Sequence, residues 1–197
     1  MSRGTLRSDA AHNRERILRA ARDLFAEKGT DVPMDEVARR AGVGIATVYR
    51  RFPTREDLIA AGMGETMAAF ARALADAREA DPATAFAELL ERVRRVQLAD
   101  RAFSDVMCPG EDGFAEAKAA MHADLLVVIE RGVAAGVLRA DYDAGDFLSV
   151  LLAHAGLVAT ATGDVDAVSR RFMAAQLIAY GPSGAELPPG SPAPVID

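Results

Sequence analysis

Side chains able to contact a nucleic acid gather in the segment "GVGIATVYRRFPTREDLI", residues 42–59. If Val48 and Phe52 of a short helix turn inward, six residues remain around its outer face. These are Ile45, Ala46, Thr47, Tyr49, Arg50 and Arg51. Small apolar groups can touch a thymine methyl, arginine can bind guanine or phosphate, and hydroxyl groups can bond phosphate oxygens. Because a surface helix of an ordinary domain rarely combines these groups, the face predicts contact with a DNA groove.

Two short helices are needed to position this face. Residues 33–41 carry apolar side chains at the i, i+3, i+4, i+7 spacing of a helix of about two turns, and Gly42 is suited to end it. A second helix must begin near Gly44 and stop before Pro53. Two short helices joined by about three residues that include glycine form the helix-turn-helix pattern, here over about residues 33–52.

The remaining sequence is also patterned as helices, so we predict an all-α fold of about nine helices. An amphipathic helix is expected over residues 13–28, and Thr54 with Asp57 comes close to a capping box that would start a long helix. Later helices are expected within residues 83–100, 101–110, 114–136, 143–161 and 165–180. The predicted organisation is a flexible basic arm (1–12), a DNA-binding domain (13–60), a helical regulatory and dimerisation domain (61–180) and a disordered tail (181–197).

Composition agrees with a helical protein in a reducing compartment. The chain has 197 residues and is 50% hydrophobic with few aromatics, which favours helices. The single cysteine, Cys108, excludes an internal disulfide framework and a cysteine-based zinc site. The N-terminus lacks the apolar core of a signal peptide, and no stretch approaches the roughly 18 apolar residues of a membrane span. We therefore expect a soluble cytoplasmic protein without membrane contact.

Charge is distributed unevenly along the chain. Residues 1–58 hold 12 Lys and Arg against 9 Asp and Glu, whereas the remainder holds 11 against 20. A mildly basic N-terminal part is thus joined to an acidic body, which confines any attraction for phosphate to one end. Such a split also arises by chance, so it carries little weight alone.

Residues 13–60 resemble the TetR family of bacterial transcriptional regulators. The resemblance rests on a first helix that ends "ARDLFAEKG" and on the segment "MDEVARRAGVGIATVYRRFPTREDLI". The family pattern is an Ala-Gly-Val turn, a Thr-x-Tyr-x-x-Phe recognition helix, and then Lys/Arg-Glu-x-Leu. The residues that match it are Ala41, Gly42, Val43, Thr47, Tyr49, Phe52, Arg55, Glu56 and Leu58.

The sequence departs from this pattern at four positions. Pro33 and Gly44 stand where the family often has a capping Thr or Ser, and both residues are tolerated at helix starts. Ile45 stands where Lys is frequent, and Arg51 where His or Tyr is common. These departures leave the fold unchanged and shift the base preference.

The resemblance implies a double-stranded operator as partner. It implies that Thr47, Tyr49 and Arg55 contact phosphates. It also places Ile45, Ala46 and Arg50 nearest the base edges, and Arg51 completes the candidate DNA-binding set. The alternative is that these side chains only solvate a helix face. For the basic residues Arg3, Arg7 and Arg14, a disordered tail is favoured over an arm in the minor groove.

The resemblance further implies a homodimer, which predicts a near-palindromic operator. The last two long helices would pair with those of a second copy, and their small residues would permit close approach. The candidate interface residues are Leu152, Gly156, Ala159, Phe172, Met173 and Leu177, with Ala153, Val158, Ala174 and Ala175 beside them. The alternative is that this stripe forms only the core of one subunit.

Regulators of this family commonly hold a small apolar ligand inside the body. The candidate lining residues are Met67, Phe70, Leu90, Phe103, Met107, Met121, His122, Leu125, Phe147, Leu151 and His154, with Met63 and Cys108 as further candidates. Methionines suit an adaptable pocket, and the two histidines would supply oriented hydrogen bonds. The alternative for any one of them is a place in the packed core.

Two other classes of protein compete with a regulator. An enzyme is disfavoured because the sequence has no His-Glu-x-x-His, nucleophile elbow, phosphate-binding glycine loop or paired metal-ligand motif. We expect no cofactor and no metal, since "DYDAGD" at residues 141–146 is explained as an acidic helix start. A helix-turn-helix protein that only binds other proteins would lack the hydroxyl and arginine groups that Thr47, Tyr49 and Arg50 supply.

Overall fold

The structure, a computed structural model, describes residues 3–107 and 112–182, with side chains described within residues 11–107 and 113–182. Every regular element in these ranges is helical, which confirms the predicted all-α fold. The elements are α1 (Arg3–Lys28), α2 (Met34–Ala41), α3 (Ile45–Arg51), α4 (Arg55–Glu79), α5 (Pro82–Ala99), α6 (Ala102–Met107), the 3₁₀ turn η1 (Asp112–Phe114), α7 (Ala115–Ala134), α8 (Ala144–Thr160) and α9 (Val165–Ala179).

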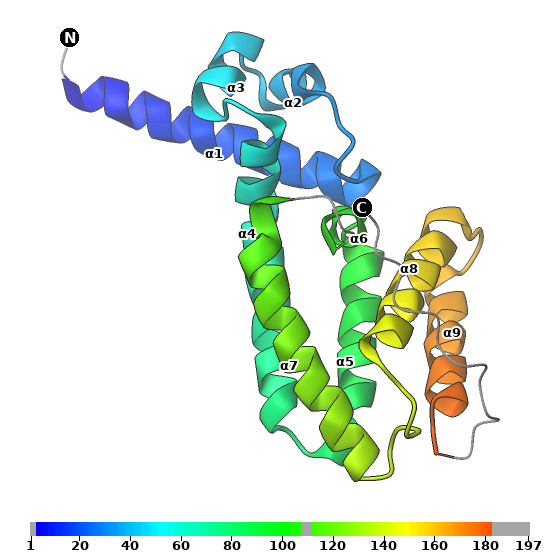
Figure 1. Ribbon diagram of the computed structural model, residues 1–197. Coiled ribbons are helices and arrows are strands. Elements are labelled where there is room, and N and C mark those ends of the chain that lie inside the picture. The colour runs from blue at the N-terminus through cyan, green and yellow to red at the C-terminus, as the bar shows by residue number, and fades with distance from the viewer. Residues whose placement is uncertain (1–2, 108–111, 183–197) are drawn as a thin grey trace.

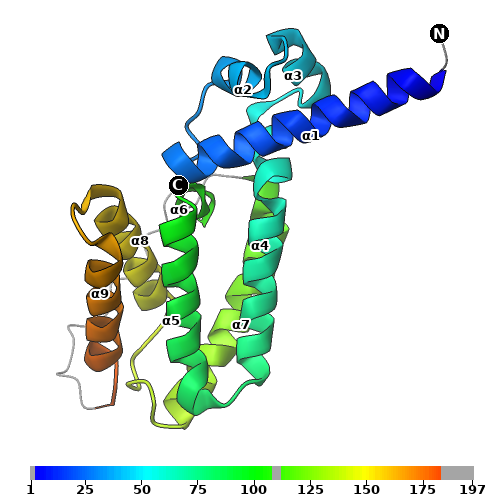
Figure 2. The same ribbon diagram turned by 180° about the vertical axis from the view of Figure 1, so that it is seen from behind.

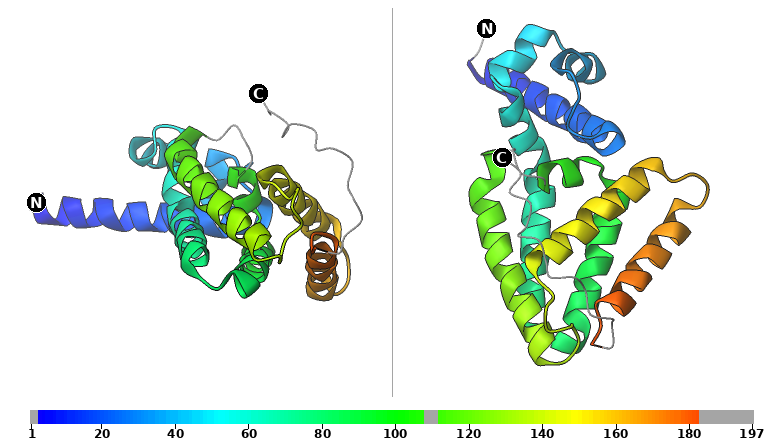
Figure 3. Two further views of the ribbon diagram at one scale, coloured as in Figure 1. Left: turned by 60° about the horizontal axis from the view of Figure 1, so that its bottom comes forward. Right: turned by 45° about the vertical axis from the view of Figure 1, so that its right-hand side comes forward.

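The helices are arranged as a head and a body, as Figure 1 shows. We call residues 3–60 the head, which contains α1, α2, α3 and the start of α4, and residues 61–182 the body. Helix α4 runs from the head down one side of the body, where α7 and α5 pack along it. Figure 2 shows the opposite side, with α5 and α4 in front of α7. Figure 3 shows α8 and α9 forming the outer edge of the body beyond α5.

The head has an apolar core that fixes the two short helices on α1. The buried side chains of this core include Ile17, Ala21, Leu24, Phe25, Val37, Ala38, Val48 and Phe52. Gly42 ends α2 with a φ of +64°, the left-handed conformation that favours glycine. Arg16 donates to the carbonyl oxygens of Ala41 at 2.6 Å and Gly42 at 3.0 Å, so it closes this end of α2. The predicted helix-turn-helix is therefore confirmed.

Helix α4 connects the head to the body without interruption. The Thr54 hydroxyl accepts the N–H of Asp57 at 3.0 Å, and the Asp57 carboxylate accepts the N–H of Thr54 at 3.1 Å. These two bonds complete the capping box that the sequence pattern indicated. With 25 residues, α4 is about 37 Å long at the usual rise per residue.

The expectation about membrane spans needs a correction for α4. Among the described helices, α4 is long and apolar enough, by length and composition alone, to cross a bilayer. Its apolar face is used inside the protein, since the buried residues of α4 include Leu58, Met63, Met67, Phe70 and Leu74. The hydropathy of α4 is therefore explained by its place at the centre of both head and body.

Aromatic rings pack against one another between elements of the body. The rings of Phe70 on α4 and Phe103 on α6 meet edge to face with centroids 4.9 Å apart. Phe86 on α5 packs in the same way on Tyr142, at 5.2 Å, just before α8.

Gly136 follows the end of α7 with a φ of +67°, as the sequence predicted for its cap.

The structure differs from the sequence prediction mainly at the N-terminus. Helix α1 begins at Arg3, so residues 3–12, which were expected to form a flexible arm, continue that helix. The sequence showed apolar periodicity only from Ile17, and the polar turns before it carry no such signal. Pro109 and Gly110, expected to end the short helix, and the tail from residue 183 lie outside the described residues.

Candidate nucleic-acid interface and ligand cavity

The outer face of α3 presents the residues that the sequence singled out. Val48 is fully buried and Phe52 nearly so, and this orientation turns the opposite side of the helix to solvent. Ile45 is 41% exposed and Tyr49 50%, which is high for large apolar and aromatic side chains. Ala46, Arg50 and Arg51 are exposed as well, whereas Thr47 is half-buried. The six predicted residues thus share one accessible surface.

Hydrogen bonding orders part of this surface. The guanidinium of Arg50 donates to the hydroxyl of Thr47 at 2.8 Å, one turn earlier on the same helix. The bond fixes a cation above a hydroxyl group, and both can bind phosphate oxygen. Behind α3, the guanidinium of Arg14 lies 5.4 Å from the ring centroid of Phe52, so a second cation packs against the helix end.

Arg55, at the start of α4, has a second role besides the one predicted for it. It donates to the carbonyl oxygen of Thr30 at 2.6 Å and to the carboxylate of Asp31 at 3.0 Å. These bonds tie α4 to the turn between α1 and α2 and neutralise part of the arginine charge. A phosphate contact by Arg55 stays a prediction.

The same turn is held from the body by Asp105 of α6. Its Oδ2 atom accepts the N–H of Thr30 at 2.7 Å and the Thr30 hydroxyl at 3.3 Å. Gly29 permits this approach, because a Cβ there would lie 2.4 Å from the same oxygen and its φ is +84°. One turn before Asp105, the N–H of Arg101 donates to the carbonyl of Ala26 at 3.3 Å. Asp105 was not among the residues predicted from the sequence.

A cavity of about 250 Å³ lies within the body. It is lined by α4, α6, α7 and α8, and seven of its lining residues were predicted. These seven are Phe70, Met107, Met121, His122, Leu125, Phe147 and Leu151. The sequence prediction missed Leu74, Lys118, Ala144, Gly145 and Leu148. Helical spacing alone could have found Leu74, four residues after Phe70, and Lys118, four residues before His122.

Four predicted pocket residues do not line this cavity. Met67, Leu90, Phe103 and His154 are buried in the core instead. The apolar residues of one helix pack against several other helices. Only some of these residues face the cavity, and the others fill the core. Cys108 lies outside the described residues.

His154 belongs to a buried hydrogen-bond network. Its Nδ1 lies 2.7 Å from the Gln97 side-chain oxygen and its Nε2 lies 2.6 Å from the Ser169 hydroxyl. The Gln97 amide in turn donates to the Ser104 hydroxyl and to the carbonyl of Leu151. Since an amide oxygen only accepts, Nδ1 carries the proton and Nε2 accepts from Ser169. Burial, aided by the Arg94 charge, lowers the pKa of His154 to about 4.

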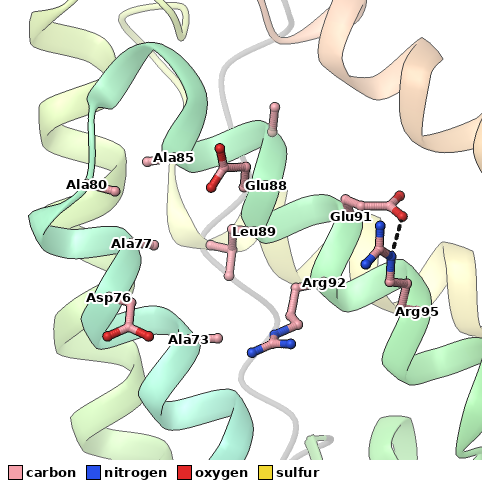
Figure 4. Close-up of a pocket in the computed structure, with 11 residues that line it drawn as sticks. Ala73, Asp76, Ala77, Ala80, Ala85, Glu88, Leu89, Glu91, Arg92 and Arg95 are labelled. Atoms are coloured by element: carbon pink, nitrogen blue, oxygen red, sulfur yellow. Dashed lines mark hydrogen bonds and ion pairs between the residues drawn. The ribbon is translucent and has the colours of Figure 1, made fainter.

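A larger, more open hollow of about 520 Å³ lies between α4 and α5. Figure 4 shows alanines from both helices along it, with Asp76, Glu88 and Arg92 beside them and an ion pair of Arg95 with Glu91. None of the predicted pocket residues lines it. Because its charged side chains are of both signs and mostly exposed, its size alone gives no chemical preference for a ligand.

Helices α8 and α9 carry a second exposed surface. Met173, predicted for a dimer interface, is instead buried in the core of the subunit, because it faces inward between α9 and the body. Leu152 and Phe172 are half-buried, whereas Gly156, Ala159 and Leu177 are exposed. The most exposed large apolar side chain in the described part of the chain is also here, Ile178 at 79%. Ala153, Ala174 and Ala175 are exposed as well, and Val158 is half-buried.

Among the described residues, no group of three or more His, Cys, Asp or Glu side chains is arranged to hold a metal ion. The acidic residues at the start of α8 are explained by its cap. Asp143 accepts the N–H of Asp146 at 2.9 Å, and Asp146 accepts the N–H of Asp143 at 3.1 Å. This reciprocal pair is a capping box.

Comparison with known proteins identifies relatives of the head. The profile of a family described as bacterial regulatory proteins, tetR family, matches residues 17–61. Over 54 residues the chain is 41% identical to an HTH-type transcriptional regulator of Staphylococcus aureus (strain USA300). That match covers 27% of this chain and 29% of the relative, so it spans less than a third of the length of the curated relatives.

Solved structures extend the similarity to the body. A TetR transcriptional regulator from Streptomyces coelicolor is 29% identical with a TM-score of 0.56, covering 87% of this chain and 99% of that one. The transcriptional regulator FadR from Bacillus subtilis, solved in complex with stearoyl-CoA, is 18% identical with a TM-score of 0.59 and the same coverage of both chains. Because the Bacillus subtilis protein is only 18% identical, its similarity concerns the fold alone.

Proposed function

Since the chain belongs to the tetR family of bacterial regulatory proteins, we propose that it is a sequence-specific DNA-binding regulator that acts as a homodimer in the cytoplasm. In this proposal it represses transcription, and a small, largely apolar ligand in the cavity of the body releases it from a near-palindromic operator. These relatives are described as transcriptional regulators and not as enzymes.

The exposed outer face of α3 is the observation that carries the proposal. It keeps Ile45 and Tyr49 in solvent next to the ordered pair of Arg50 and Thr47. A helix that only covered the head would gain nothing from exposing large apolar groups, whereas a helix that enters a major groove needs them there.

Fluorescence anisotropy with a labelled duplex from the DNA that flanks the coding region tests this function. We expect saturable binding that survives an excess of random DNA and weakens as salt is added, because phosphate contacts release counterions. Arg50→Ala, at a predicted base contact, should weaken binding of the flanking DNA by about 1–3 kcal/mol, and Tyr49→Ala, at a predicted phosphate contact, should weaken binding of flanking and random DNA alike. Arg92→Ala, which removes an arginine from the body, is the matched control.

The outcome that would overturn the proposal is equal, weak binding of flanking and random DNA by the native chain and both head variants. A genome-wide selection of bound fragments that also returned nothing would then favour a protein-interaction module.

Helix α6 supplies a direct connection for release by a ligand. Met107, its last residue, lines the cavity, and Asp105 on the same helix bonds the head at Thr30. A ligand that binds better when α6 is displaced shifts the population toward heads that no longer match both operator halves. The Bacillus subtilis regulator, which shares this fold, was solved in complex with stearoyl-CoA, and this supports a small-molecule ligand for the present chain.

A further inference from the structure

We propose that the cavity of the body binds an amphipathic monocarboxylate, with its apolar part among the lining Phe, Leu and Met side chains and its carboxylate on Lys118. The inference rests on the proposed regulatory function, and it adds the sign of charge, the size and the orientation of the ligand.

The sign of charge follows from the residues that line the cavity. Among these described residues, Lys118 is the only one with a permanent charge, and none is Asp or Glu. Asp143 and Asp146, close in sequence to the lining residue Ala144, are engaged in the capping box and do not line the cavity. Among these described lining residues, a cationic ligand would find no carboxylate to replace its lost hydration, which is costly. An anion would instead gain a charge-assisted hydrogen bond.

The ammonium of Lys118 can serve a ligand whatever else it contacts. It has three donors, so a carboxylate can bind one of them beside another partner. The side chain is half-buried, and its long apolar stem can lie along the cavity wall with the charge at the end. Lys118 is therefore suited to anchor one polar group at the boundary of an apolar space.

The size of the cavity limits the apolar part. An apolar cavity of about 150 Å³ is known to hold one benzene molecule. The present cavity, at about 250 Å³, has room for one ring and a short aliphatic chain. Phe70, Phe147 and Met121 supply the aromatic and thioether surfaces that pack well on a ring.

The orientation follows from the direction of α7. This helix begins beside the head and runs to the far end of the body, as Figure 1 shows. Lys118 lies in its first turn, whereas Leu125 lies about two turns further along. The carboxylate would thus point toward the head and the ring away from it. The charged end of the ligand would lie at the end of the cavity nearer the turn that contains Thr30, which Asp105 of α6 bonds.

Three probes of matched shape test the proposal by isothermal titration calorimetry at neutral pH: phenylbutanoate, phenylbutanol and phenylbutylamine. We expect phenylbutanoate to bind at least tenfold more tightly than the alcohol, and the amine to bind more weakly than both. Lys118→Met should remove the preference for the acid over the alcohol and leave binding of the alcohol nearly unchanged.

Lys28→Met is the matched control, because Lys28 and Lys118 are the only lysines of the chain and Lys28 pairs with Glu36 in the head. Tighter binding of the amine, equal binding of acid and alcohol, or no binding of any probe would each overturn the proposal. None of these results would change the outcome of the anisotropy experiment with the α3 variants, so the two proposals fail separately.

A second readout uses the same scarcity of lysine. Reductive methylation with an isotope-enriched reagent labels only Lys28, Lys118 and the N-terminal amine, which gives a simple NMR spectrum. Phenylbutanoate should shift the Lys118 signal and leave that of Lys28 in place. A shift of neither signal at saturating acid would contradict a carboxylate on Lys118 even if the acid bound.

Discussion

The carboxylate of Asp105 and the backbone N–H of Thr30 meet at 2.7 Å, and this bond joins a helix of the body to a turn of the head. The carbonyl of the same Thr30 accepts from Arg55, 2.6 Å away at the start of α4. A single residue of the turn thus links α6, the turn itself and α4. Thr30 is only 5% exposed, so the loss of Asp105 would leave its N–H unsatisfied, whereas its carbonyl also accepts the N–H of Val32 at 2.8 Å and would keep that partner without Arg55.

Replacing Asp105 should loosen the head without unfolding it. Asp105→Ala leaves the Thr30 N–H without its acceptor, so we expect a loss of about 1–3 kcal/mol in the free energy of unfolding measured with urea. Asp105→Asn retains an acceptor oxygen and should lose less. Faster hydrogen exchange at the Thr30 amide in Asp105→Ala is the local readout, and unchanged exchange would contradict the role. Asp76→Ala, an exposed acidic residue of α4, is the control.

Gly29 should tolerate no side chain while Asp105 is present. Gly29→Ala meets two costs, the left-handed φ of +84° and a contact of 2.4 Å with the Asp105 carboxylate. Gly163 has a nearly equal φ of +81°, and a Cβ at that position would meet nothing within 4 Å. Gly163→Ala therefore isolates the first cost, about 1–2 kcal/mol. We expect Gly29→Ala to be clearly more destabilising than Gly163→Ala in urea denaturation.

A double-mutant cycle separates the contact from the backbone strain. The extra loss at Gly29 should shrink when Asp105→Ala is also present, because the clashing carboxylate has gone. Strict additivity of the two substitutions would mean that the close approach has no energetic consequence.

The buried His154 should make the protein less stable in mild acid. Its pKa is lowered from 6.5 to about 4 in the folded chain, so the unfolded chain binds more protons between these two values. Stability is then fully present above about pH 6.5 and falls as the pH is lowered toward 4, by up to about 3 kcal/mol. In His154→Phe this part of the pH dependence should disappear from urea-denaturation curves, although the variant is less stable throughout. His122→Gln alters an exposed histidine and should retain the slope.

An acidic residue on α9 should separate the proposed dimer. Ile178 is 79% exposed in one subunit, so Ile178→Asp costs the isolated subunit little and places a charge in the proposed interface. We expect analytical ultracentrifugation to show a dimer for the native chain and mostly monomer for this variant. Leu126→Asp, at a 47% exposed leucine of α7, is the matched control. Dissociation by both variants or by neither would contradict an interface on α9.

The sequence predicted the helices well because their signals are local. The caps at Thr54 and Gly42 and the inward pair of Val48 and Phe52 depend on neighbours within one or two turns, and the structure has them as predicted. The i, i+4 spacing of Val48 and Phe52 also predicted which side of α3 faces outward. Apolar periodicity gave no sign that α1 extends to Arg3, because those turns are polar.

The features that the sequence did not predict are contacts between distant segments. Asp105 and Thr30 are 75 residues apart, and nothing near either residue indicates the other. His154 looked like a polar group for a pocket, yet Gln97 and Ser169, 57 and 15 residues away, satisfy it in the core. Whether a large apolar side chain borders a cavity or fills the core depends on the packing of several helices, which periodicity along one helix does not contain.

The connection of the head through both α4 and α6 limits how it can turn. A rigid object attached at one place can rotate about any axis through that place, whereas one attached at two places can rotate only about the line that joins them. With the Asp105 bond intact, α3 of each subunit would therefore swing along a single arc, like a door on two hinges. When that bond and the one from Arg101 to Ala26 both open, the arc becomes a cone, and the two heads of the proposed dimer would lose the alignment that one fixed operator spacing requires, without any helix having to unfold.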